Sequence, residues 1–291
     1  MKRKFLCLCL VLGLASCAWA DDYVGMLARM RTTPQEFFML MKNSWANKGW
    51  VIEGGDHSTS KAKFYDSLSL MQMALNRGDI DEMILPDFVA EYLLRVSANY
   101  EASCVSSCAS SSGGMSLCFG FMKDNRELRD RWNSALTYLR NNQKLAALEK
   151  KYIKDFPKSD EYDHIYGIDT RKKKRKERIT FEKFPDSPTI RVAVTGDMPP
   201  IDFIDEEGFP AGYNMAVLSE IGRFLKVNIL PVNVETPART AALVSGRADV
   251  VFWYELNKQV KIQPDIPDEV ILSVPYLDWN KFIHVTLSEE E

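Results

Sequence analysis

The sequence has little of what would place it in several common protein classes. Its 291 residues include only 3 histidines, and His57, His164 and His284 do not have the spacing of a zinc site. The net charge of -3, with 26% charged residues, provides no basic field for nucleic acid. Glycine and proline contents are ordinary, which favours a globular fold.

Catalytic signatures are also missing. The chain has no nucleophile elbow, no phosphate-binding Walker loop and no Gly-x-Gly-x-x-Gly, and no acid and base are held at a fixed spacing. We therefore expect a protein that is not an enzyme and that carries no cofactor and no metal.

After the first 20 residues, no segment reaches the ~18 uninterrupted apolar residues of a membrane-spanning helix. Residues 1–20 have a basic start, an apolar stretch and Ala18-Trp19-Ala20, which predicts a secretory signal peptide. A second interpretation is a lipoprotein box, Leu14-Ala15-Ser16-Cys17, which would leave Cys17 as a lipidated first residue. Both place the protein outside the cytoplasm, in the periplasm or the extracellular space, with lipid anchoring left open.

Cysteine is scarce after the signal. Cys104, Cys108 and Cys118 remain, together with Cys17 if it is lipidated. One disulfide is plausible in an oxidising compartment, but the spacing does not determine which two cysteines pair.

The most informative stretch is residues 189–253, where the hydrophobic period changes in the order β-α-β-α-β. Asn214 is predicted to cap the first helix, while Thr236 and Pro237 open the second and Gly246 closes it. This alternation implies a parallel sheet with ligands beyond the carboxyl ends of its strands.

Five short sequence motifs follow one another along and after this stretch. They are Pro199-Pro200-x-x-Phe203, an Asp-Glu-Glu-Gly turn, Gly212-Tyr213-Asn214, Leu243-x-Ser245-Gly246-x-x-Asp249 and Ser273-x-Pro275-Tyr276. Together they resemble the first lobe of the family 3 extracellular solute-binding proteins, the amino-acid-type receptors of ABC importers. The resemblance implies an α/β fold of two lobes, each a mostly parallel sheet flanked by helices.

The earlier part of the chain resembles the second lobe of the same family. The matching motifs are Asp66-Ser67-Leu68, Gly78-Asp79-Ile80-Asp81, Val89-Ala90-Glu91-Tyr92-Leu93 and Glu127-Leu128-Arg129-Asp130. The implied organisation is a second-lobe-like domain at 22–122, helices at 123–157 that pack on the other lobe, a basic linker at 158–188 and a first-lobe-like domain at 189–291. The lobes thus stand in permuted order, which indicates a circular permutation or, alternatively, a remnant of two tandem receptors.

The resemblance implies a monomer that captures a small polar solute, an amino acid or a related compound, between its lobes and delivers it to an ABC permease. A helix opening at Thr33 resembles the family's Gly-Thr-Thr carboxylate site, although Arg31 replaces the glycine. The candidate ligand residues are Thr32, Thr33, Asp87, Asp197, Asp202, Trp253, Tyr254 and Glu255. Trp253 and Tyr254 fit a core position equally well.

Three departures put the standard amino-acid clamp in doubt. No arginine follows Tyr254, Pro86 stands where the family has an aspartate, and Ile201 replaces an aromatic residue. The alternative function is therefore a sensory or structural protein that retains the binding-protein fold without transport.

Overall fold

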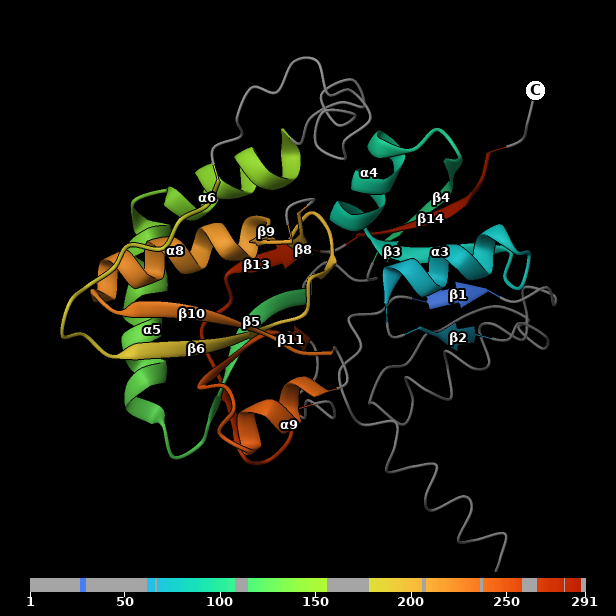
Figure 1. Cartoon of the computed structure of the whole chain (residues 1–291). Helices are drawn as coiled ribbons and strands as arrows, with labels where there is room; N and C mark the ends of the chain where they lie inside the picture. Colours follow the sequence, from blue (N-terminus) through green and yellow to red (C-terminus); the bar gives the residue numbers. More distant parts are fainter. Residues whose placement is uncertain are drawn as a thin grey trace, which may run out of the picture.

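The computed structural model forms two lobes, each built on its own β-sheet (Figure 1). It describes residues 27–29, 62–65, 67–107, 115–155, 178–205, 208–235, 238–257, 266–279 and 281–288. The signal peptide, Cys17 and most of the linker lie outside these ranges. Within them, no helix has the length and apolar character needed to cross a bilayer.

From here on, the first lobe is the one whose sheet comes mainly from residues 27–107, and the second lobe is the one whose sheet comes mainly from residues 115–279, which is the reverse of the family's lobe numbering used above. The sheet of the first lobe has the order β2-β1-β3-β14-β4, and every neighbouring pair is antiparallel. Its strands are β1 (Leu27–Arg29), β2 (Ala62–Phe64), β3 (Glu82–Pro86), β4 (Tyr100–Ser107) and β14 (Lys281–Leu287). The prediction of a mostly parallel sheet is wrong for this lobe. Because α4 (Asp87–Val96) returns the chain between them, β3 and β4 run in the same direction, but β14 enters between them in the opposite direction.

The sheet of the second lobe has the order β10-β6-β11-β5-β12, with β13 also paired to β5. Its strands are β5 (Met115–Met122), β6 (Thr189–Val194), β10 (Asn228–Asn233), β11 (Val250–Asn257), β12 (Val270–Leu272) and β13 (Leu277–Trp279). The pairs β10–β6 and β6–β11 are parallel, which confirms the β-α-β-α-β prediction for this stretch. The other pairs, those made by β5, are antiparallel.

The two predicted helices of this stretch are α8 (Tyr213–Leu225) and α9 (Arg239–Val244). Gly246 follows α9 with a φ of 70°, as expected for a glycine that ends a helix. Asn214 is not the cap of α8. The cap position is held by Gly212, and Asn214 lies inside the first turn with its side chain fully buried.

Two strands lie in the lobe opposite to the one expected from their position in the sequence. Strand β5 belongs to the predicted domain 22–122, but it lies in the second sheet. Strand β14 belongs to the predicted domain 189–291, but it lies in the first sheet. Hydrophobic alternation identifies a strand without identifying its partners, so this exchange could not be seen in the strand pattern alone.

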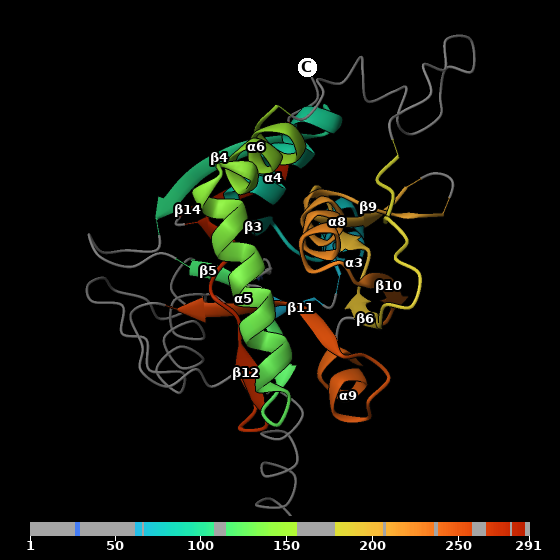
Figure 2. The same cartoon turned by 90° about the vertical axis from the view of Figure 1, so that its left-hand side faces the viewer.

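Helices α5 (Arg126–Asn141) and α6 (Lys144–Glu149) follow β5 and pack against α8 of the second lobe (Figure 2). An ion pair of 2.6 Å between Lys144 and Glu220 links α6 to α8. These helices thus lie beside α8, on the lobe that contains β6 and β10. A short π-helix, η1 (Lys150–Lys154), continues from α6.

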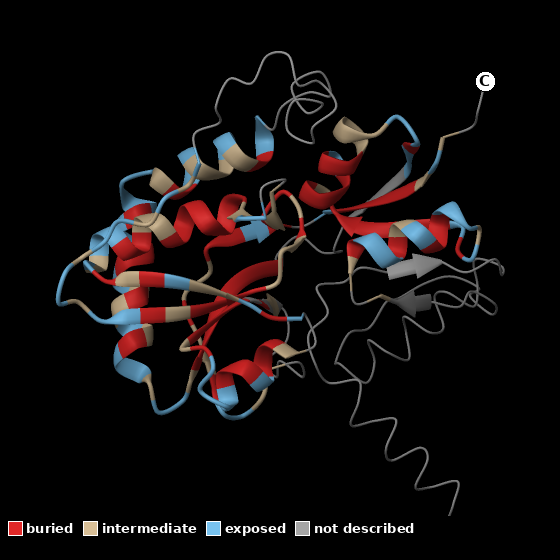
Figure 3. Ribbon diagram, viewed as in Figure 1, coloured by how far each residue is buried: buried red, intermediate tan, exposed pale blue. Residues whose placement is uncertain are grey.

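One cluster of buried side chains extends through both lobes, and a smaller second cluster includes residues of α9, β6 and β11. Figure 3 marks the buried residues in red along the ribbon. The helices α3 (Leu68–Asn76) and α4 cover the first sheet with their buried faces, and Trp132 of α5 is fully buried against Phe119 and Phe121 of β5. The lobes are therefore joined by packing as well as by the chain.

Candidate functional site

The candidate site lies where the carboxyl ends of β6 and β11 face the first lobe. After β6 the chain forms a small sheet of β7 (Asp197–Met198), β8 (Asp202–Ile204) and β9 (Pro210–Ala211). Strand β7 contacts α3 of the first lobe. This is the edge of an α/β sheet where ligands usually bind.

Asp202 is at this edge, but its carboxylate is fully buried and holds the protein's own backbone. Oδ2 accepts a hydrogen bond from the backbone N–H of Thr195 at 3.0 Å and from its hydroxyl at 3.3 Å. Burial raises the pKa of Asp202 to about 6 because the charged form loses its hydration, and the charge of Asp197 adds to this effect. In this arrangement Asp202 positions the loop between β6 and β7.

Asp197 is half-buried at the start of β7, where it is paired with Phe203 of β8. Its carboxylate lies close enough to Asp202 to influence that residue's pKa. Of the candidate residues on the second lobe whose side chains are described, Asp197 is the only one that is not fully buried.

Tyr254 is a core residue. It is 2% exposed, its hydroxyl lies 2.6 Å from Oγ1 of Thr240 on α9, and its ring covers Gly120 of β5. A Cβ on Gly120 would lie 2.3 Å from that ring, so the glycine makes room for it. Trp253 and Glu255 lie on β11, and the structure does not describe their side chains.

We expect Tyr254→Phe to lower the free energy of unfolding by about 1 kcal/mol through loss of the buried hydrogen bond. Urea unfolding measures this effect, and Tyr138→Phe, on an exposed tyrosine of α5, is the matched control with almost no change. Equal free energies of unfolding for the two variants would contradict the assignment of Tyr254 to the core.

Asp87 is the first residue of α4, on the first-lobe side of the junction. Its Oδ1 accepts the N–H of Phe88 at 2.8 Å. Burial raises its pKa above the ordinary value, opposed by this hydrogen bond and by the charge of Lys281. The charges of Glu91 and, more weakly, of Glu149 on α6 also raise this pKa. Thr32 and Thr33 lie outside the described residues.

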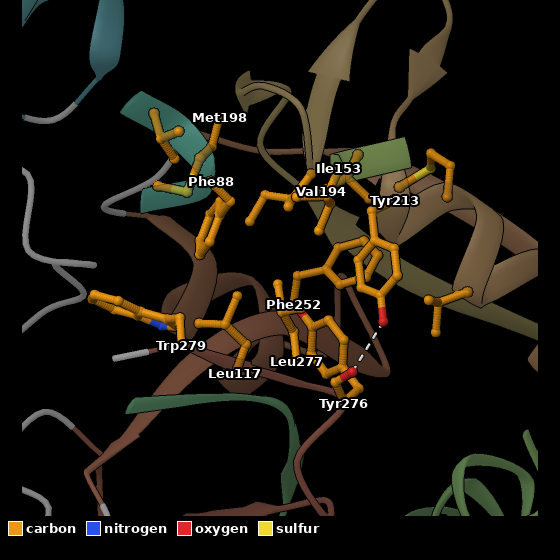
Figure 4. Packing of buried hydrophobic residues seen from close by; sticks show 14 of the residues in the cluster. Phe88, Leu117, Ile153, Val194, Met198, Tyr213, Phe252, Tyr276, Leu277 and Trp279 are labelled. Carbon is orange, nitrogen blue, oxygen red and sulfur yellow. Dashed lines mark hydrogen bonds between the residues drawn. The ribbon is translucent and has the colours of Figure 1, made fainter. Parts of the chain in front are cut away.

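Apolar side chains fill the junction between these polar groups. Phe88 meets Trp279 edge to face with ring centroids 6.0 Å apart, and Trp279 meets Phe282 of β14 at 4.8 Å. Met198 of β7 is fully buried in the same cluster and lies on the same side of it as Phe88 (Figure 4). The described part of the junction is therefore well packed and largely apolar.

Arg239 is a buried charge at this edge that is not among the predicted site residues. It is the first residue of α9, it is 1% exposed, and its Nη1 donates to the carbonyl of Phe252 at 3.2 Å. Burial raises the pKa of the Tyr276 phenol, and the charge of Arg239 acts weakly in the opposite direction. An arginine at a helix start is usually exposed, and no signal in the sequence marks this one as buried.

Among the described side chains, no three or more His, Cys, Asp or Glu residues come together as a metal site. Cys118 is buried in β5, while the side chains of Cys104 and Cys108 are not described, so their pairing stays open.

Comparison with known proteins gives one family match. Residues 190–287 match the bacterial extracellular solute-binding proteins, family 3. These residues supply β6 to β14, which are most of the second sheet and the strand that crosses to the first. That family consists of solute-binding proteins, not enzymes. No curated protein sequence matches the chain.

Three solved structures are similar to the chain at low identity. The first is the PBP AgaA from A. tumefaciens R10 in complex with agropinic acid, with a TM-score of 0.40 and 10% identity over 80% of this chain and 56% of that one. The second is a phosphate-binding protein of a phosphate ABC transporter from Streptococcus pneumoniae TIGR4, with a TM-score of 0.30 and 9% identity over 60% of this chain and 53% of that one. The third is a periplasmic oligopeptide-binding protein from Borrelia burgdorferi, with a TM-score of 0.34 and 11% identity over 68% of this chain and 38% of that one. The chain spans about half or less of the length of these proteins.

Proposed function

We propose that this protein is an extracytoplasmic solute-binding protein, which captures a small polar solute such as an amino acid between its lobes for an ABC importer. The family match at residues 190–287 is the observation that carries the proposal. The arrangement of the strands is compatible with it, because β4 and β14 belong to one sheet and β5 and β13 to the other, so the chain passes from one lobe to the other twice.

A thermal-shift screen with amino acids and small organic acids tests this function. A solute at 100 times its dissociation constant should stabilise the protein by about 2.7 kcal/mol, because it binds the folded state and not the unfolded one. Each hit should also make the protein more compact in X-ray scattering. A screen without a hit would favour the second candidate below.

The second candidate is a sensory or structural protein that retains the binding-protein fold. The apolar cluster that includes Met198, Phe88 and Trp279 favours it, since these side chains offer no polar partner to a polar solute. The missing arginine after Tyr254 points the same way. Such a protein would stay compact in solution whatever solute is added.

We infer that the mature chain begins at Cys17 or at Asp21, from the two cleavage signals in the first 20 residues. Intact-mass measurement of the native protein distinguishes these starts, and a start at Cys17 should carry an added diacylglycerol. A full-length chain recovered from the cytoplasm would contradict export.

We also infer a circular permutation of the two lobes, in preference to a tandem remnant. In the tandem alternative each half would have its own sheet, yet each sheet here draws a strand from both halves of the chain. Permutation is tolerated where old and new chain ends lie at the surface.

A further inference from the structure

The two lobes meet at a second place besides the apolar junction, where α4 of the first lobe contacts η1 of the second. Helix α4 lies on β3 and β14. The π-helix η1 continues α6, which is fixed to α8 by packing and by the ion pair between Lys144 and Glu220. A bond between α4 and η1 is therefore a bond between lobes.

Arg95 makes that bond. Its Nη1 donates to the backbone carbonyl of Lys154 at 2.8 Å. Its Nη2 lies 3.3 Å from Oε2 of Glu91, one helical turn earlier on α4, and this contact orients the guanidinium. The side chain is 32% exposed, so its stem is largely covered while its charged head bridges the two helices.

The backbone carbonyl of Lys154 lacks a hydrogen-bond donor within its own helix. It belongs to the last residue of η1, where carbonyls have no N–H partner within the helix. A helix carboxyl end also carries partial negative charge, which a cation stabilises. Arginine side chains are common partners of such carbonyls, but here the arginine comes from the other lobe.

The charges around this contact are balanced between the lobes. Lys154 pairs with Glu149 at 2.7 Å, and its pKa is raised by that partner first and also by Asp87 and Glu91 of α4. Ile153 of η1 is buried in the same apolar cluster as Phe88 of α4. The contact thus has polar and apolar parts.

We propose that Arg95 is a clasp: by capping η1 across the junction it holds the two lobes together before any solute binds, and so limits how far the ligand-free protein opens. The proposal concerns the ligand-free state and does not depend on which solute, if any, the protein binds.

X-ray scattering of the full ligand-free chain tests the clasp. Arg95→Ala should shift the ratio of open to closed molecules by about tenfold, which corresponds to ~1.4 kcal/mol, and should enlarge the radius of gyration. Arg129→Ala is the matched control: Arg129 also lies on a helix beside a carboxylate, 2.6 Å from Asp130, and no contact described for it crosses to the first lobe. The control should scatter as the wild type does.

Circular dichroism verifies that each variant is folded. If Arg95→Ala loses helix signal, Arg95→Gln, which keeps an amide donor on a similar stem, replaces it and should give a smaller expansion. Unchanged scattering for a folded Arg95 variant would overturn the clasp, as would a wild type already as expanded as the variant. Because no solute is present, this result is independent of the thermal-shift screen.

Discussion

The segments 22–157 and 188–291, expressed separately, are expected to be poorly folded alone and to fold when mixed. The first segment lacks β14, which lies between β3 and β4 and is hydrogen-bonded to both. Its Phe282, Ile283 and Val285 are buried. At about 1.5 to 3 kcal/mol for each buried apolar side chain, their loss approaches the whole stability of a small domain, about 5 to 15 kcal/mol.

The second segment loses still more. It lacks β5, which pairs with β11, β12 and β13 and whose residues Met115 to Phe121 are all buried. It also lacks α5, whose Trp132 covers that strand. Circular dichroism and size-exclusion chromatography of each segment and of the mixture measure the effect.

The control is the intact protein cleaved once between residues 158 and 188. Because β5 stays in the second sheet and β14 stays in the first, the cleaved protein should remain folded as a non-covalent pair. Two segments that fold independently and do not associate would contradict the permutation and favour the tandem remnant.

Asp202→Asn should gain stability relative to the wild type as the pH rises. The folded pKa of Asp202, about 6, is above its ordinary value of 3.8, so folding favours the protonated form. Its contribution is fully present below pH 3.8 and is lost as the pH rises through about 6. At 1.36 kcal/mol per pKa unit, the loss amounts to about 3 kcal/mol. An asparagine at position 202 is neutral at every pH, so the variant does not undergo this loss of stability.

The measurement is urea unfolding of both proteins between pH 4 and 8, and the predicted quantity is the change with pH in their difference. A constant cost of replacing the carboxylate by an amide cancels from that change. Asp268→Asn, at an exposed position, is the control for the general effect of replacing a carboxylate by an amide. A difference independent of pH for Asp202→Asn would show that this carboxyl titrates like an exposed one.

The fold of the second lobe could be predicted from the sequence because the matched motifs encode local structure. Gly212 has a φ of 100°, and a Cβ there would lie 2.7 Å from the carbonyl oxygens of Pro200 and Ile201. Asp249 accepts hydrogen bonds from the backbone and the guanidinium of Arg191. Such requirements leave a pattern at fixed positions in the sequence.

Other residues of the motifs that resemble the family also make hydrogen bonds within the core. The hydroxyl of Ser273 accepts the N–H of Phe119 at 3.0 Å, and the Tyr213 hydroxyl donates to the carbonyl of Tyr276 at 3.0 Å. These motifs therefore predict the packing of a lobe better than they predict a ligand. This is why Tyr254 and Asp202, selected for their position at strand ends, have structural contacts.

The rest of the candidate site depends on contacts between distant parts of the chain. The apolar junction brings Phe88 against Trp279, and the buried Arg239 of α9 donates to the carbonyl of Phe252 on β11. Neither a period nor a motif specifies such pairs. The antiparallel entry of β14 into the first sheet escaped prediction for the same reason.

The position of β14 has a consequence for how the protein is made and exported. Synthesis proceeds from the amino end, so β3 and β4 leave the ribosome long before residues 281–287, which must lie between them. Until then the first sheet has an open slot in place of its inner strand, and contacts of such large sequence separation form slowly. The growing chain should therefore stay incompletely folded until these residues have been made, and an incompletely folded chain is the form that the export proposed above would require.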